Sequence, residues 1–254
     1  MPADFLDHPV PIAFAHRGGA GHFPENSWPA FEHAVRLGYA YLETDAQATS
    51  DGALVAFHDR TLDRVTDRAG AIAAMPASAV TAARIAGTEP IPLLEDLLAA
   101  WPDIRFNIDV KNAPVARPLA ELVRRTAAWD RICITSFSAR RLRATRLLLD
   151  RPVCMATSPV GACALRGGVP GRAAAAAFAR RWVRCAQLPV RLATAPILAR
   201  ARAAGLAVHV WTVNEEAVMN ALLDLGVDGI MTDQTEMLRR VLIRRGQWHP
   251  RGGS

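Results

Sequence analysis

The sequence contains almost no lysine, few aromatic residues and no long apolar run. Of its 30 basic residues only Lys111 is a lysine, and aromatic residues make up 6% of the 254 positions. Because the aromatic residues do not interleave with the arginine-rich stretches, we expect no nucleic-acid partner. The apolar runs are interrupted well before the ~20 residues that a membrane helix needs, so no stable membrane insertion is expected.

Cysteine is also scarce, with residues at 133, 154, 163 and 185 and no C-x-x-C spacing. This pattern suggests neither a zinc site nor a disulfide framework, and we expect buried free thiols. The first residues carry acids instead of a basic segment followed by an apolar one, so no secretory signal is indicated and a cytoplasmic protein is expected. The net charge of +6 favours phosphate-bearing substrates or an anionic membrane face, or it reflects a solvated arginine surface.

Predicted strands and helices alternate along the chain. The strands are expected at about 11–15, 41–45, 105–110, 131–135, 153–156, 183–188, 207–212 and 229–232. The helices are expected at about 28–37, 93–101, 115–128, 138–149, 172–179, 194–204, 215–225 and 235–245. Eight such units predict an α/β fold, a (β/α)₈ TIM barrel, as a single domain over 1–254 with its core at about 12–246. A doubly wound open sheet is the alternative, disfavoured because no G-x-G-x-x-G turn follows the first strand.

One stretch does not fit the repeated unit. The turn signal Ser50-Asp51-Gly52 predicts a hairpin that folds residues 54–57 back along the second strand and returns His58 to the strand ends. Residues 59–90 are polar, rich in alanine and weakly periodic. We therefore expect a small insertion at about 59–90, after the His58 hairpin, which could act as a lid.

Polar or aromatic residues stand where the predicted strands end: His16, Arg17, Glu43, Asp45, Asp109, Lys111, Ser136, Phe137, Gln187 and Trp211. The carboxyl ends of barrel strands form the active-site rim, so these side chains are expected to meet there. Period-2 alternation puts Glu43 and Asp45 on one strand face, as hard oxygen ligands for a divalent cation require. The single lysine indicates a site that needs a compact ammonium instead of a guanidinium.

Taken together, the ordered motifs carry a family resemblance. They are His16-Arg17-Gly18, Glu25-Asn26-Ser27, Glu43-Thr-Asp45, Phe57-His58-Asp59, Asp109-Val-Lys111, Ser136-Phe137, Trp211-Thr-Val-Asn214 and Thr232-Asp233. From about residue 14 to 233 the chain resembles the glycerophosphodiester phosphodiesterase family. The resemblance implies a (β/α)₈ barrel that hydrolyses glycerophosphodiesters to glycerol 3-phosphate and an alcohol. It also implies a divalent metal, Mg²⁺ or Ca²⁺, bound by Glu43, Asp45 and Asp109, the last standing where the family has a glutamate.

The predicted chemistry follows from the substrate's charge. A phosphodiester anion repels nucleophiles, so Arg17, Lys111 and the metal are expected to neutralise its non-bridging oxygens. His16 and His58 suit the two proton transfers, because an imidazole titrates near pH ~6.5; which is acid and which is base stays open. By the resemblance, the substrate's own glycerol hydroxyl attacks first and gives a cyclic phosphate that water then opens.

The remaining candidates have supporting roles. Glu25 and Asn26 are expected to fix the rim. Trp211 is expected to cover the glycerol carbons or to pack under the loops. His209 lies in mid-strand, where a hydrogen-bonded core histidine is expected. Other readings are a lysophospholipase D or a phospholipase-C-like activity on lipid phosphodiesters, and a non-catalytic module that binds a phosphate ligand.

Overall fold

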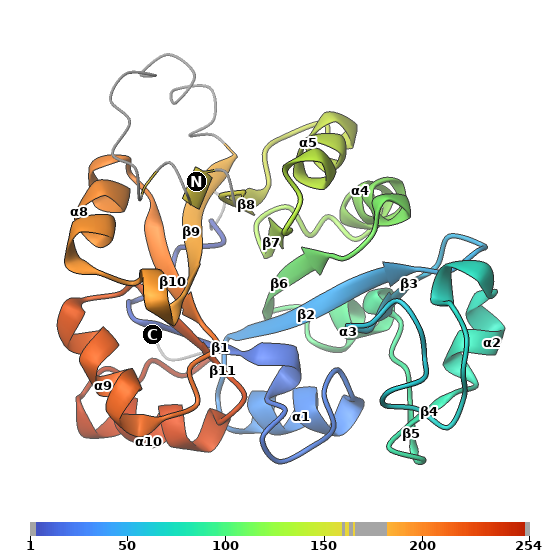
Figure 1. Ribbon diagram of the computed structural model, residues 1–254, viewed down its shortest axis with the longest axis horizontal. Coiled ribbons are helices and arrows are strands. Elements are labelled where there is room, and N and C mark those ends of the chain that lie inside the picture. Colours follow the sequence, from blue (N-terminus) through green and yellow to red (C-terminus); the bar gives the residue numbers. More distant parts are fainter. Residues whose placement is uncertain (1–3, 159–160, 163–164, 166–181, 252–254) are drawn as a thin grey trace.

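The computed structural model describes residues 4–158, 161–162, 165 and 182–251 (Figure 1). Within them, eight parallel strands pair in the order β1-β2-β6-β7-β8-β9-β10-β11, and β11 pairs with β1 to close the ring. The predicted (β/α)₈ barrel is confirmed. An open doubly wound sheet is excluded, since such a sheet has two free edges.

Each predicted barrel strand is present, with bounds that differ by a few residues at most. The strands are β1 Ile12–Ala15, β2 Tyr41–Ala48, β6 Arg105–Val110, β7 Ile132–Thr135, β8 Cys154–Ala156, β9 Val183–Pro189, β10 Ala207–Trp211 and β11 Gly229–Thr232. The second strand runs three residues beyond Asp45, because its far end pairs with a hairpin arm outside the barrel.

Helices cover the outside of the barrel (Figure 1). They are α1 Trp28–Arg36, α3 Leu94–Ala100, α4 Ala116–Arg125, α5 Ala139–Leu148, α8 Ala195–Ala203, α9 Glu216–Leu225 and α10 Thr235–Arg244. The helix predicted at 115–128 ends earlier, because Ala127 adopts a left-handed φ of 50° that a right-handed helix cannot include. The helix predicted at 172–179 lies outside the described residues. Short 3₁₀ turns occupy His16–Gly18, Ala113–Val115 and Val190–Leu192.

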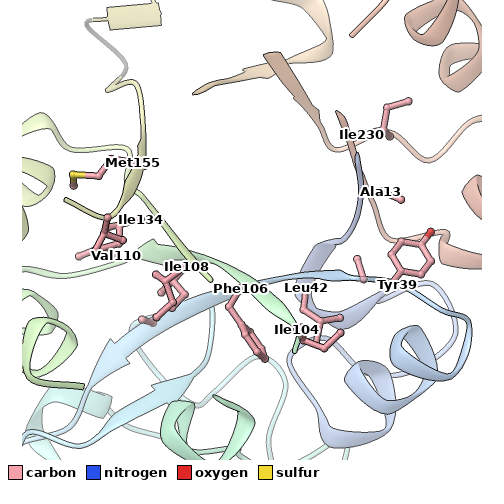
Figure 2. Packing of buried hydrophobic residues seen from close by; sticks show 14 of the residues in the cluster. Ala13, Tyr39, Leu42, Ile104, Phe106, Ile108, Val110, Ile134, Met155 and Ile230 are labelled. Atoms are coloured by element: carbon pink, nitrogen blue, oxygen red, sulfur yellow. The ribbon is translucent and has the colours of Figure 1, made fainter. Parts of the chain in front are cut away.

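Strand alternation separates the core from the site. On β6, Phe106, Ile108 and Val110 point outward into the apolar layer beneath the helices, where Figure 2 shows them beside residues of the neighbouring strands. The residues between them, Asn107 and Asp109, face the barrel interior. One strand therefore supplies both the core and the chemistry.

The lower part of the barrel interior is apolar. Phe5, Phe14 and Tyr41 form a buried cluster there, and the Tyr41 hydroxyl donates to the Phe5 carbonyl at 2.6 Å. Phe5 is 1% exposed, so the segment before β1 closes the amino-terminal end of the barrel.

The cysteines share this interior cluster. Cys133, Cys154 and Cys185 are buried free thiols, as predicted, and Cys163 lies outside the described residues. The sequence spacing did not suggest that they meet, but the three Sγ atoms lie within 4.8 Å of one another. Linear spacing missed this grouping, since it arises between adjacent strands.

The expectation for His209 is confirmed for its place in the core and wrong for its hydrogen bonds. Its side chain is fully buried, but neither ring nitrogen has a hydrogen-bond partner among the described residues. The residue faces the barrel interior, where apolar residues and thiols surround it. Backbone groups of the described strands therefore form no hydrogen bonds with its ring nitrogens.

The predicted hairpin and insertion are both present. The arm β3, Leu54–Ala56, pairs antiparallel with β2, and the amide of Phe57 donates to the Asp45 carbonyl at 2.9 Å. His58 is thereby returned to the rim. The chain then forms η2 Ile72–Ala74, α2 Ala77–Thr81 and the two-stranded sheet β4 Arg84–Ile85 with β5 Glu89–Pro90. The insertion has its own apolar cluster, which includes Leu62, Ile72, Val80 and Ile85.

None of the helices in the described part of the chain has the length and apolar character that crossing a bilayer requires.

We expect Ser27→Ala to lower the free energy of unfolding by about 1 kcal/mol, the usual loss for a helix N-cap. Ser27 is buried, its Oγ accepts from the Ala30 amide and donates to the Pro24 carbonyl, and it begins α1. Chemical denaturation measures the change. Thr194→Ala is the matched control, because Thr194 begins a helix of equal length without a side-chain cap bond. Equal losses in both variants would contradict the capping role.

Candidate active site

The carboxyl ends of the barrel strands surround a cavity of about 430 Å³. It is lined by the residues predicted to bind phosphate, bind metal or transfer protons: His16, Arg17, Glu43, Asp45, His58, Asp109, Lys111 and Trp211. Glu25 and Asn26 stand behind this lining. The sequence motifs, which are spread over about 200 residues, therefore meet in one place.

The turn after β1 is tightly constrained. Arg17 adopts a left-handed φ of 51°, which directs its amide to donate to Glu43 Oε2 at 2.8 Å. Gly19 has a φ of 95°, and a Cβ there would lie 2.6 Å from Thr235 Cγ2. The Gly-Gly turn is thus required so that the backbone can reach the carboxylate of the next strand.

Two carboxylates from β2 are buried together. Burial, and next the negative charge of Asp45, raises the pKa of Glu43 to about 7. Burial also works against ionisation of Asp45, but Lys111 and Arg17 outweigh it and hold the pKa of Asp45 below its usual value. The pair therefore calls for cationic partners.

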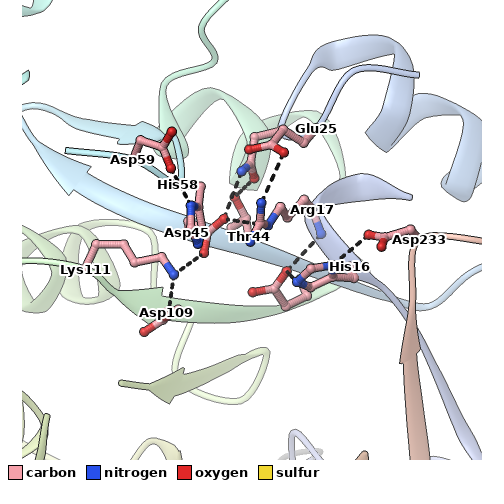
Figure 3. A network of polar contacts seen from close by, with 12 residues as sticks. His16, Arg17, Glu25, Thr44, Asp45, His58, Asp59, Asp109, Lys111 and Asp233 are labelled. Carbon is pink, nitrogen blue, oxygen red and sulfur yellow. Dashed lines mark hydrogen bonds and ion pairs between the residues drawn. The ribbon is translucent and has the colours of Figure 1, made fainter. Parts of the chain in front are cut away.

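The single lysine of the chain is one such partner. Lys111 Nζ contacts Asp45 Oδ1 at 2.8 Å and Asp109 Oδ2 at 2.7 Å (Figure 3). Burial opposes its charge, yet the two carboxylates raise the pKa of Lys111 above its usual value. Its ammonium accordingly stays charged inside the rim.

The donor set fits a hard divalent cation. Asp109 Oδ1 is buried and has no hydrogen-bond donor among the described residues, and burial raises the pKa of this carboxyl. Asp109 and the buried pair Glu43 and Asp45 offer oxygen ligands of the kind that Mg²⁺ and Ca²⁺ take. In this structure the carboxylate oxygens of the three residues do not all lie within 4.8 Å of one another. The Lys111 ammonium lies between the carboxylates of Asp45 and Asp109.

Each rim histidine is bonded to its own aspartate. His16 Nδ1 lies 2.7 Å from Asp233 Oδ1, and His58 Nδ1 lies 2.6 Å from Asp59 Oδ1. Figure 3 shows the two histidines on opposite sides of the polar network. Because an ionised carboxylate only accepts, Nδ1 carries a proton in both pairs, and Nε2 is the atom left to exchange one.

The aspartates are ionised at neutral pH. A hydrogen bond from Arg64 is the main reason that the pKa of Asp59 is lowered to about 2. Burial opposes ionisation of Asp233, but its bond to His16 keeps its pKa below the usual value. In return, although burial alone would lower the pKa of His16, Glu43 and Asp233 raise it.

The residues predicted to fix the rim make contacts that suit this role. Glu25 pairs with Arg17 Nη1 at 3.1 Å and also with Arg64 from the insertion. Asn26 donates to Asp45 Oδ2 at 3.0 Å while its carbonyl oxygen accepts from Thr44. They join the first helical unit to the second strand and, through Arg64, to the insertion.

The sequence prediction gave no role to several residues of this network. Asp59 and Asp233 stood within the quoted motifs, and their places beside His58 and at the end of the last strand were available signals. Arg64 had no such signal. Gln187 Nε2 donates to Asn107 Oδ1 at 2.7 Å across the barrel, a contact that strand spacing alone does not predict.

One wall of the cavity is aromatic. Trp211 packs edge-on against Phe137, with ring centroids 5.5 Å apart and planes at 82°. Phe137 is 62% exposed, which is unusual for a large apolar side chain. The pair offers an apolar surface beside the charged groups, with Lys111 Nζ 5.8 Å from the centroid of the Phe137 ring.

Comparisons with known proteins agree with this geometry. Residues 16–237 match the model of the glycerophosphoryl diester phosphodiesterase family. A Mycobacterium tuberculosis protein named probable glycerophosphodiester phosphodiesterase 2 is 43% identical, over 96% of both chains. The glycerophosphodiester phosphodiesterase of Caldanaerobacter subterraneus is 30% identical, over 92% of this chain and 98% of its own.

A solved phosphodiesterase of Oleispira antarctica has the same fold, with a TM-score of 0.77 at 20% identity over 92% of this chain and 97% of its own. That structure holds the product sn-glycerol 3-phosphate. The family match covers most of this chain, and the relatives are matched over nearly their whole lengths. The chain therefore belongs to the glycerophosphoryl diester phosphodiesterase family.

Proposed function

We propose that this chain is a metal-dependent hydrolase that converts glycerophosphodiesters to glycerol 3-phosphate and an alcohol. The observation that carries the proposal is the pair of aspartate-bonded histidines on two sides of a buried cluster of cations and carboxylates. The family match supports the reaction class, and the product complex of the Oleispira antarctica neighbour supports glycerol 3-phosphate as the product.

Phosphate binding falls to Arg17 and Lys111. Both line the cavity and pair with buried carboxylates. Their N–H groups are fixed before substrate arrives, so little reorganisation is needed to neutralise the non-bridging oxygens.

Glu43, Asp45 and Asp109 would hold Mg²⁺ or Ca²⁺, and the free buried Oδ1 of Asp109 supports this assignment. When bound, the cation supplies further neutralisation of the phosphate charge. A cation would also relieve the repulsion between Glu43 and Asp45.

The two histidines divide the proton transfers. His16, whose pKa is raised, holds a proton near neutral pH and gives it from Nε2 to the leaving alkoxide. His58 takes the proton of the attacking hydroxyl at its Nε2. In the first step the glycerol oxygen bonds to phosphorus as the bond to the alcohol breaks, and in the second step water opens the cyclic ester.

A lipid phosphodiester is the second candidate substrate. The apolar wall formed by Phe137 and Trp211 would suit an acyl chain, as lysophospholipase D or phospholipase-C-like reactions require.

The single-domain organisation and the cytoplasmic location remain predictions from the sequence.

We expect release of glycerol 3-phosphate from glycerophosphocholine and glycerophosphoethanolamine with Mg²⁺ or Ca²⁺, and none with EDTA. His16→Ala should lower kcat by about 100-fold or more, because a positioned acid or base contributes roughly that much. Glu43→Ala should lose the metal-dependent rate. A coupled assay for glycerol 3-phosphate measures both.

His33→Ala is the matched control, since His33 also pairs with a carboxylate, Glu236, but does not line the cavity. It should keep the wild-type rate. If the folded wild type cleaves only lysophosphatidylcholine, the lipid reading replaces the proposal. If it cleaves neither class with any metal, the chain is a binding module.

We also expect a pH effect from Asp233→Asn. The Asp233 carboxylate favours protonated His16, so its removal lowers the pKa of His16. The alkaline limb of the kcat profile should then move to lower pH. Glu236→Gln, at the His33 pair, should leave the profile in place. An unmoved limb in Asp233→Asn argues against His16 as the acid.

Replacement of the single lysine tests its geometry. Lys111→Arg should lower kcat/KM by about tenfold or more, since a charge-assisted hydrogen bond contributes about 1.5–3 kcal/mol and the guanidinium does not fit between Asp45 and Asp109. Arg36→Lys, the reverse exchange at an exposed ion pair, should change nothing. Full activity of Lys111→Arg would show that only the charge is needed.

A further inference from the structure

Three thiols meet inside the barrel, below the rim. Cys133, Cys154 and Cys185 come from the consecutive strands β7, β8 and β9 and face the interior. Their Sγ atoms all lie within 4.8 Å of one another, and those of Cys133 and Cys185 are 3.8 Å apart. Bulky branched side chains usually fill this layer of a barrel, so a set of thiols calls for an explanation.

The next strand, β10, brings a histidine to the same layer, although its ring nitrogens do not lie within 4.8 Å of all three Sγ atoms. His209 is fully buried, and both of its ring nitrogens lack a hydrogen-bond partner among the described residues. A buried polar ring without a partner is costly. The centroids of the Phe14 and His209 rings are 4.8 Å apart with their planes tilted by 50°, and a Cβ at Gly229 would lie 2.9 Å from His209 Cδ2.

We propose that Cys133, Cys154 and Cys185 bind a structural zinc ion in the barrel interior, separate from the proposed active site, and that the His209 ring moves in to complete the ligand set. Tetrahedral zinc with Zn–S bonds of about 2.3 Å has ligand atoms about 3.8 Å apart. The distance between the Cys133 and Cys185 sulfurs matches that edge.

The donor chemistry separates this site from the rim. Thiolate and imidazole ligands select zinc, whereas carboxylates select Mg²⁺ or Ca²⁺. Four protein ligands leave no open position, so the ion would stabilise the fold and take no part in the reaction. Gln187 Nε2 lies 4.0 Å from Cys185 Sγ, where its N–H offsets thiolate charge, and its other contact is to Asn107 of the cavity.

Burial determines how the metal enters. Phe5 and Tyr41 close the lower end of the barrel, so zinc must bind while the chain folds. Each thiol that binds gives its proton to the solvent.

The test measures zinc after refolding. Because Cys163 lies outside the described residues, Cys163→Ser is the parent protein for every variant. It is refolded with Zn²⁺ and a thiol reductant, passed over a weak chelator and analysed for metal. We expect about one tightly held zinc per chain, and roughly tenfold less or lower in Cys185→Ala and His209→Gln.

Glu43→Gln is the matched control, because it alters the carboxylate site and leaves the thiols intact; it should keep the zinc. Loss of zinc in Glu43→Gln alone would assign the metal to the rim and overturn the proposal. Parent protein that holds no more zinc than Cys185→Ala would do the same.

A second measurement covers variants that fail to fold. Parent protein refolded with Co²⁺ should show the intense sulfur-to-cobalt charge-transfer absorption of thiolate ligation, and a Cys154→Ser chain should not. If the folded parent lacks this absorption, the three cysteines are only small apolar residues that fill the barrel.

Discussion

The rim depends on the ammonium of Lys111, which is held between two buried carboxylates. Asp45 and Asp109 are register partners on neighbouring strands, so their charges would repel without a cation between them. Arg17 approaches Asp45 from the first strand, and Asn26 donates to it from the loop before α1. These contacts join the first three barrel units by charge, and they place two cations and three acids in the wall of one cavity.

This arrangement follows from one property of strands. Alternate residues of β2 and β6 face the helices or the barrel axis, and the outward set is apolar except for Thr44, which donates to Asn26. The inward set is free to change with depth, from the aromatic floor at Phe14 and Tyr41 to the charged rim. Residues that face the helices therefore stabilise the fold, and residues that face the barrel axis at the carboxyl ends of the strands form the site. The position of a residue on its strand indicates which of these roles it has.

Local patterns explain why much of this was predictable. Apolar runs and turn residues predicted all eight barrel strands, and the rule that strand ends form the rim placed His16, Glu43 and Lys111 together. The remaining features depend on how neighbouring strands are aligned with one another, which a local sequence pattern does not predict. Asp233 meets His16 across 217 residues, three thiols gather from separate strands, and His209 lies where no backbone group reaches its ring. Arg64 comes from an insertion whose weak periodicity gave no indication of where it docks.

The segment before His16 has a consequence for how the domain should be delimited. The family match spans residues 16–237, yet β1 ends at Ala15 and pairs on both sides with barrel strands. Phe5, which precedes β1 in the sequence, is buried and closes the amino-terminal end of the barrel. A protein trimmed to the matched residues would thus lose one strand of the barrel and the segment that closes its amino-terminal end. Every residue of the proposed active site would still be present.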